Sequence, residues 1–156
     1  MGVVRLVLPL SEGNPATSSL PGTIIRQVEP SLETNAIAEL TEIIREHGAW
    51  PSAAGFQAEF ASRPGREVIV WLAESGGGPA GLVALVLARH AAGVRASVAW
   101  LLVAPAVRRR GVGRALVAAA VQAARDRAAD EVWVETRSDW DDAAGFWQAV
   151  GFRPVG

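Results

Sequence analysis

Residues 94–120 read VRASVAWLLVAPAVRRRGVGRALVAAA, and this stretch decides the fold. Its first part is apolar and rich in β-branched valine, which is typical of a strand. Pro105 ends that strand, an Arg/Gly-rich turn follows, and from Gly111 the apolar residues recur at helical spacing. Such a turn is a place to bind a phosphate, because the first amides of a helix have no internal partner and the helix dipole is positive there.

The residues of this turn limit the types of phosphate-binding site that it can form. Gly111 and Gly113 have no Cβ, so the backbone can approach an anion closely. A P-loop is excluded, because the chain contains no lysine. Leu116 stands where a dinucleotide fingerprint would have its third glycine, which argues against that site. The remaining interpretations are an anion-binding loop and an arginine-rich, solvated turn that only caps a helix. The cationic side chains are Arg108, Arg109, Arg110 and Arg114.

A family resemblance favours the anion-binding loop. Residues 108–115, RRRGVGRA, resemble the (Q/R)xxGx(G/A) loop of the GNAT superfamily of acyl-CoA-dependent N-acetyltransferases. Residues 143–152, AAGFWQAVGF, resemble the family's NxxAxxFYxxxGF motif, and the two motifs occur in the family's order with one strand between them. The resemblance implies an α+β GNAT (acyl-CoA N-acyltransferase) fold. This fold has a mixed, mostly antiparallel central sheet of six to seven strands, flanked by about four helices.

Local patterns predict the other elements. Residues 1–22 form an N-terminal extension whose Ser/Gly/Pro-rich part is a flexible linker, and residues 23–156 form the acetyltransferase domain. Ser31 is a candidate N-cap for a helix whose buried face begins at Leu32, and a shorter helix carries Phe56 and Phe60. Further helices are predicted at 111–129 and 142–150, and strands at 23–28, 67–74, 81–89, 94–103 and 131–137.

Three connections follow from these elements. Short turns join the strands at 67–74, 81–89 and 94–103, so these strands are expected to form an antiparallel meander. The strand at 131–137 follows a helix, so it is expected to pair parallel with the strand at 94–103. Residues 152–155 begin a sixth strand, and the family's seventh strand, which normally follows it, is missing from the C-terminal segment. Residues 3–8 could supply an edge strand there, within the chain or from a partner subunit, or they could be a disordered tail.

Composition excludes several classes of function. A net charge of −1 gives no general attraction to nucleic acid or to an acidic membrane. The absence of cysteine excludes disulfides, thiol nucleophiles and thiolate metal sites, and with only two histidines no metal is expected. No apolar run is long enough to span a membrane, so a cytoplasmic protein is expected.

The resemblance assigns a coenzyme A site. The backbone of the strand end is expected to pair with the pantetheine arm, and the basic loop to hold the pyrophosphate. The expected cofactor-binding residues are Leu101, Leu102, Val103, Arg108, Arg109, Arg110, Gly111, Val112, Gly113, Arg114, Ala115, Trp140, Ala143 and Phe146.

The catalytic positions depart from the family pattern. The position of the usual glutamate base is Ser97, and the tyrosine that protonates the departing thiolate is replaced by Trp147. Glu135 is the best replacement base, ahead of Glu74 and His90, so the catalytic candidates are Ser97, Glu135 and Trp147. An acceptor pocket is expected to be lined by Trp50, Phe56, Ser97 and Glu135.

The resemblance therefore implies an N-acetyltransferase. Such an enzyme moves an acetyl group from acetyl-CoA directly to a primary amine of a small molecule or peptide, and a homodimer is a candidate assembly. The departures at Ser97 and Trp147 predict a slow enzyme or an acceptor of low pKa. The same departures also favour an alternative function of another class. In this alternative, the protein binds acyl-CoA or has a regulatory role, and it uses the same fold with little or no catalysis.

Overall fold

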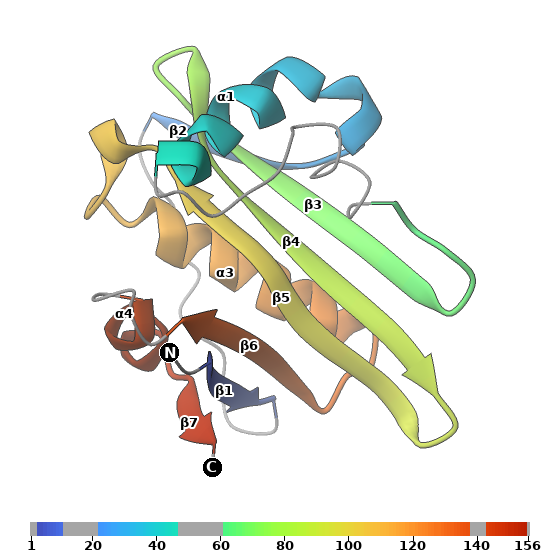
Figure 1. Cartoon of the computed structure of the whole chain (residues 1–156). Helices are drawn as coiled ribbons and strands as arrows, with labels where there is room; N and C mark the ends of the chain where they lie inside the picture. The colour runs from blue at the N-terminus through green and yellow to red at the C-terminus, as the bar shows by residue number, and fades with distance from the viewer. Residues whose placement is uncertain (1–2, 11–21, 47–60, 138–142, 156) are drawn as a thin grey trace.

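The computed structural model describes residues 3–10, 22–46, 61–137 and 143–155 (Figure 1). Within these residues one mixed sheet has the strand order β2-β3-β4-β5-β6-β1-β7. Its strands are β1 (Val3–Pro9), β2 (Thr23–Val28), β3 (Arg66–Ser75), β4 (Gly78–His90), β5 (Gly93–Val103), β6 (Glu131–Arg137) and β7 (Arg153–Val155). The helices are α1 (Thr34–Glu46), α3 (Val112–Asp126) and α4 (Ala143–Ala149).

The two faces of the sheet are covered by different helices. Helix α3 packs behind β3, β4 and β5 in Figure 1, and ten of its residues are buried in the larger hydrophobic cluster or beside it. Helix α1 lies on the opposite face, where Ile37 and Leu40 contact Val70, Leu72 and Leu82. Strands β3 and β4 are buried on both faces, which explains why both read as continuous apolar runs in the sequence.

The predicted strand pairing is confirmed around β5. Strands β3, β4 and β5 form an antiparallel meander, and β6 pairs parallel with β5. A bulge interrupts β5: Ala84 of β4 pairs with Trp100 and the next residue, Leu85, pairs with Val98, so Ala99 has no partner on β4. Because of this extra residue, odd-numbered side chains of β5 point to one face of the sheet before Ala99 and to the opposite face after it.

Strand β1 lies inside the sheet. It pairs antiparallel with β6 along its whole length and with β7 at Arg5, Leu6 and Val7. Of the alternatives that the sequence leaves open, pairing within the chain is the one observed, but the expected edge position is wrong because β7 occupies that edge. Alternation puts Leu6 and Leu8 into the core, where both are buried.

Two local predictions need correction or stay untested. Ser31 does not cap a long helix, since Pro30–Leu32 form a short 3-10 turn and α1 begins at Thr34. Leu32, predicted on the buried face, is 80% exposed because it belongs to that turn. The helix expected around Phe56 and Phe60 lies outside the described residues, which contain three α-helices.

We expect Leu6→Ala to lower the free energy of unfolding by about 2–5 kcal/mol, because it removes a fully buried side chain from the core. Urea denaturation followed by circular dichroism measures this. Ile24→Ala is the control, since Ile24 is 66% exposed and its truncation should cost less than about 0.5 kcal/mol. Equal stability of Leu6→Ala and the wild-type protein would contradict the placement of β1 in the core.

Candidate functional site

The loop between β5 and α3 turns through two left-handed residues. After Val103 the chain forms a short 3-10 turn at Pro105–Val107, and Arg109 and Gly111 then have φ angles of 64° and 86°. Glycine adopts such angles without strain, whereas an arginine rarely does, and strained residues cluster at binding sites. Among the described residues, no backbone carbonyl accepts a hydrogen bond from the amides of 109–111. The loop that precedes α3 therefore presents amides that no backbone carbonyl of the described chain binds.

The charge around this loop is positive and uncompensated. Arg108, Arg109, Arg110 and Arg114 are all exposed, and none of them forms an ion pair with a carboxylate of the described residues. The first turn of α3 has no acidic residue. Other arginines of the described chain do pair, for example Arg26 with both Glu33 and Glu74. That pairing raises the pKa of Arg26, mainly through the hydrogen bond to Glu74. An anion is the partner that the loop arginines lack.

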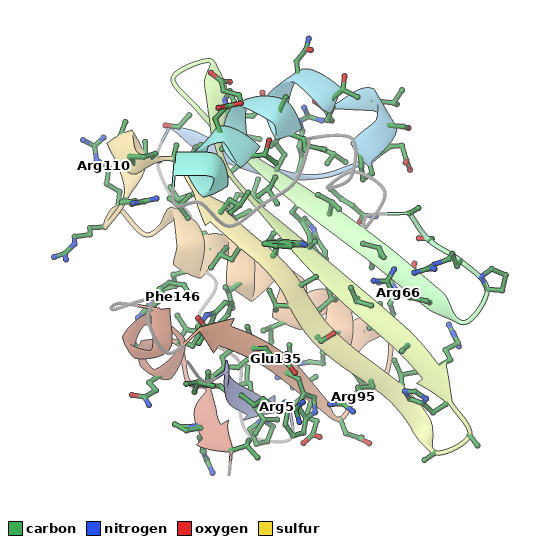
Figure 2. All side chains as sticks on the ribbon, in the orientation of Figure 1. Arg5, Arg66, Arg95, Arg110, Glu135 and Phe146 are labelled. Carbon is green, nitrogen blue, oxygen red and sulfur yellow. The ribbon has the colours of Figure 1, made fainter. Side chains whose placement is uncertain are left out.

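Two arginines of the loop are held by carbonyl groups. The Nε of Arg108 donates to the Val103 carbonyl at 3.2 Å, and Nη2 of Arg114 donates weakly to the Ala149 carbonyl at 3.5 Å. These contacts tie the loop to the end of β5 and to the end of α4. Figure 2 shows Arg110 on the outer side of the loop, away from the sheet.

Strands β5 and β6 separate next to this loop. They pair at only three positions, from Ala96 and Val132 to Val98 and Val134. Beyond Val98, β5 continues to Val103 with β4 as its one strand partner in the described chain. Figure 1 shows the two strands diverging toward their carboxyl ends, with α3 behind them. The Val103 carbonyl accepts from Arg108 Nε. Apart from that carbonyl, the backbone of residues 101–103 has one edge that no strand of the described chain covers, and an extended ligand could pair with it as in strand addition.

Helix α4 closes the α3 side of this opening. A Cβ on Gly113 would stand 3.3 Å from the Phe146 ring and 3.4 Å from Val103 Cγ2. Glycine therefore lets the first turn of α3, the end of β5 and α4 meet at a single point. Val112, Gly113 and Ala115 are buried there, while the neighbouring arginines stay in solvent.

The catalytic candidates lie on both faces of the sheet. Ala96 and Val98 are buried in the cluster that contains α3, so Ser97 between them points to the α1 side, where it pairs with Trp133. Glu135, two residues after Trp133, points to that side as well. Trp147 is 5% exposed in the core on the α3 side, with its ring edge-on to Phe146 and Phe152.

Glu135 has a partner that the sequence did not suggest. Its Oε1 accepts a hydrogen bond from Arg5 Nε at 2.9 Å, and both side chains are well exposed, 59% for Glu135 and 62% for Arg5. Figure 2 shows the two residues on neighbouring strands. The pair joins residues 130 positions apart, so only the register of β1 on β6 could have revealed it.

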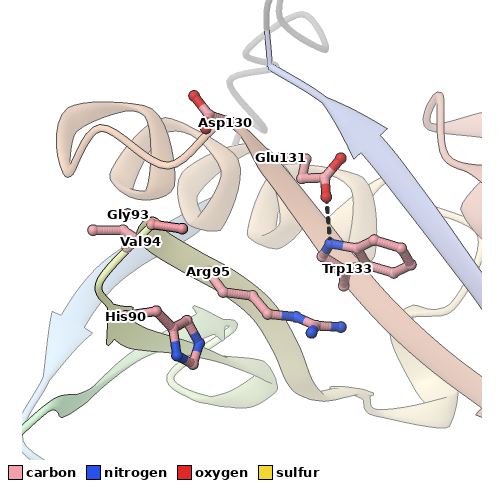
Figure 3. A pocket seen from close by; sticks show the side chains of 8 residues that line it. His90, Gly93, Val94, Arg95, Asp130, Glu131 and Trp133 are labelled. Carbon is pink, nitrogen blue, oxygen red and sulfur yellow. Dashed lines mark hydrogen bonds between the residues drawn. The ribbon is translucent and has the colours of Figure 1, made fainter.

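A shallow cavity of about 200 Å³ lies beyond Ser97, toward the start of β5 (Figure 3). Arg95 stacks over the Trp133 ring at 5.0 Å from its centroid, and Trp133 Nε1 donates to Glu131 at 2.8 Å. No sequence pattern predicted this cavity, because it is built from two separate segments, the β4–β5 turn and the start of β6. Its lining residues are His90, Ala92, Gly93, Val94, Arg95, Asp130, Glu131 and Trp133.

Several predicted residues cannot be placed. Trp50 and Phe56, expected in the acceptor pocket, and Trp140, expected near the cofactor, lie outside the described residues. Ala143 is the first residue of α4.

Within the described parts of the chain, no helix is both long and apolar enough to cross a lipid bilayer. The same parts contain no cluster of three metal-ligating His, Cys, Asp or Glu residues.

We expect Gly111→Ala to destabilise the protein by about 1–2 kcal/mol, because alanine must adopt a left-handed φ of 86° at the N-cap of α3. Gly145→Ala, in α4, should instead stabilise it by up to about 1 kcal/mol, since no atom lies within 4 Å of the added Cβ. Urea unfolding of both variants measures the difference. A change of the same sign in both would contradict the assigned loop geometry.

The fold agrees with solved structures at low sequence identity. A tandem GNAT protein from the clavulanic acid biosynthesis pathway superposes with a TM-score of 0.76 at 18% identity, over 98% of this chain and 50% of that one. A functionally uncharacterised Staphylococcus epidermidis protein gives 0.74 at 14% identity, over 99% and 57%. The protein AAC(6′)-Iy, in complex with a bisubstrate analogue, gives 0.68 at 18% identity, over 84% and 90%.

The first two of these proteins are longer, and the chain spans about half the length of one and 57% of the other. Among proteins with curated descriptions, none matches this sequence. The family model described as "Acetyltransferase (GNAT) family" matches residues 34–152. Since this match includes both sequence motifs and most of the chain, the protein belongs to the GNAT family of acetyltransferases.

Proposed function

We propose that the protein binds acetyl-CoA at the β5–α3 loop and transfers its acetyl group to a primary amine of a small molecule or peptide. The observation that carries this proposal is the combination of free amides and unpaired arginines at the N-terminus of α3, directly beside a strand edge without a partner. A diphosphate joined to an extended arm matches both features.

The residues present fit this ligand. The amides of 109–111 and the arginines beside them would hold the diphosphate, while the backbone of 101–103 would pair with the arm. Phe146 and the start of α4 would close the other side, with Val112, Gly113 and Ala115 forming the buried floor. Ala143 and Trp140 belong to this proposed site by their place in the second motif. When bound, acetyl-CoA supplies an activated acetyl thioester.

The acceptor is proposed to approach from the α1 side. Glu135 is the proposed base, because it is an accessible carboxylate at the point where β5 and β6 separate. It would accept the proton of the attacking amine, with Ser97 holding a water molecule beside it. Trp147 occupies the family's acid position but has no acidic proton, so a thiol with a pKa near 8.5 would leave unaided. Trp50 and Phe56 remain the proposed aromatic wall of the acceptor pocket.

The nature of the acceptor is supported by similarity alone. A soil metagenome enzyme crystallised with sisomicin is named as an aminoglycoside acetyltransferase, and AAC(6′)-Iy was solved with a bisubstrate analogue that joins CoA to acetylneamine. We extend only the class of acceptor, an amine, to this protein. A cytoplasmic location, a homodimer and a catalytic domain of residues 23–156 behind an extension of residues 1–22 complete the proposal.

The experiment is a thiol-release assay with acetyl-CoA and a panel of amines whose pKa values range from about 8 to 10.4. Release that depends on an amine supports transferase activity. Because serine replaces the family's glutamate base at position 97, amines of low pKa, which are less protonated at neutral pH, should react fastest there. Binding of acetyl-CoA without release by any amine would support the alternative, an acyl-CoA-binding or regulatory protein. That alternative is favoured by Ser97 and Trp147 at the catalytic positions.

We expect Arg110→Glu to weaken CoA binding about 10- to 100-fold, the effect of losing a charge-assisted contact to phosphate. Titration calorimetry at two salt concentrations measures it, and the wild-type affinity should fall as salt rises. Arg89→Glu makes the same change of charge at the far end of β4 and should leave the affinity unchanged. Equal affinities for Arg110→Glu and Arg89→Glu would refute this diphosphate site.

We expect Glu135→Gln to lower kcat/KM for the best amine by about 10²- to 10⁴-fold while CoA affinity stays the same, since a general base is removed and the loop is untouched. Glu67→Gln is the matched control, because Glu67 is a similarly exposed carboxylate paired with an arginine, Arg127. A Glu135→Gln enzyme as fast as the control would exclude Glu135 as the base.

A further inference from the structure

One buried hydroxyl group lies where β5 and β6 separate and has no hydrogen-bond partner among the described residues. Thr136 is 4% exposed, and its Oγ1 is a buried polar atom without a hydrogen bond in the described parts of the chain. It lies two residues beyond Val134, the last residue of β6 that pairs with β5. Two strand residues span about 7 Å, so this hydroxyl stands just past the point where the strands part.

The side chain of Thr136 faces the α3 side of the sheet. Val132 and Val134 are buried in the cluster that contains α3, and strand alternation places Thr136 on the same side. On β1 it is opposite Val4, and the next β5 side chains on its face are Leu101 and Val103. Its surroundings are therefore apolar, and none of these side chains can accept or donate a hydrogen bond.

Leaving this hydroxyl unpaired is costly. A buried polar group without a hydrogen bond costs about 1–3 kcal/mol, and buried hydroxyls are normally satisfied. Valine has the same shape and would remove this cost, and it is at least as favourable in a strand. The other buried threonine of the described chain, Thr41, follows the rule, since its Oγ1 donates to the Ala38 carbonyl at 2.9 Å. Thr136 thus needs a partner from outside the described chain.

We propose that the Thr136 hydroxyl is a binding group for the cofactor arm, and that its hydrogen-bond partner is an amide of that arm. This inference rests on the proposed function, because the arm enters the opening only if CoA binds at the β5–α3 loop. The family's asparagine position, which is Trp140 here, has no side-chain amide, so the Thr136 hydroxyl would supply a polar contact to the arm instead. The contact would fix the depth of the arm and hence the position of the thioester.

The test compares CoA with adenosine 3′,5′-bisphosphate, which has the nucleotide but no arm. For Thr136→Val we expect the dissociation constant for CoA to rise about 3- to 10-fold, the effect of one neutral hydrogen bond, and that for the bisphosphate to stay unchanged. Without ligand, the same variant should unfold at a higher urea concentration than the wild type, because an unsatisfied polar group has been removed. Thr136→Ser keeps the hydroxyl and should keep the wild-type CoA affinity.

Thr41→Val is the matched control. It removes a hydroxyl that is already bonded within the protein, so it should lower the urea midpoint and leave CoA affinity unchanged. A Thr136→Val variant that binds CoA as tightly as the wild type, or that loses stability as Thr41→Val does, would overturn the inference while leaving CoA binding intact. If the wild type bound neither CoA nor the bisphosphate, that result would instead overturn the proposed function, and this inference with it.

Discussion

The polar groups along a strand edge need partners, and the open edge of β5 is the constraint on which the site depends. A parallel neighbour normally satisfies such an edge, yet β6 leaves it after Val98. Two features lie near this point: the bulge at Ala99 and the packing of α4 against the first turn of α3. The open backbone, the free amides of the loop and the unpaired arginines follow one another along the chain, so a single extended anion could satisfy all three.

The N-terminal strand lets the sheet tolerate this opening. Strand β1 pairs with β6 on the side away from β5, so the last residues of β6, which β5 does not hold, are held by β1. Its apolar residues fill the core beneath β6, and its Arg5 reaches the carboxylate of Glu135. An exposed pair of this kind contributes little to stability, so its more important effect is to orient the carboxylate. A segment that the sequence suggested as an extension thereby supports the strand that carries Glu135, the proposed base.

The sequence predicted the elements that depend on local patterns. The β5–α3 loop, the meander and the parallel pairing of β6 follow from glycine positions, apolar runs and chain order, and the structure confirms them. Prediction from the sequence failed where contacts join distant segments. The interior place of β1, the Arg5 partner of Glu135 and the Arg95–Trp133 stack all depend on the register between strands. Leu32 shows a different failure, because apolar spacing cannot distinguish a short 3-10 turn from the first turn of a helix.

The bulge also divides the chemistry between the two faces of the sheet. Before Ala99, odd-numbered residues such as Ser97 point to the α1 side; after it, Leu101 and Val103 point to the α3 side. Groups for the cofactor and groups for the acceptor can therefore alternate along one short strand without sharing a face. Cofactor contacts made by the backbone survive most side-chain changes, whereas proton transfer needs particular side chains. In the proposed function, this difference would let the chain bind acetyl-CoA through its loop and open strand while serine and tryptophan stand at the expected catalytic positions.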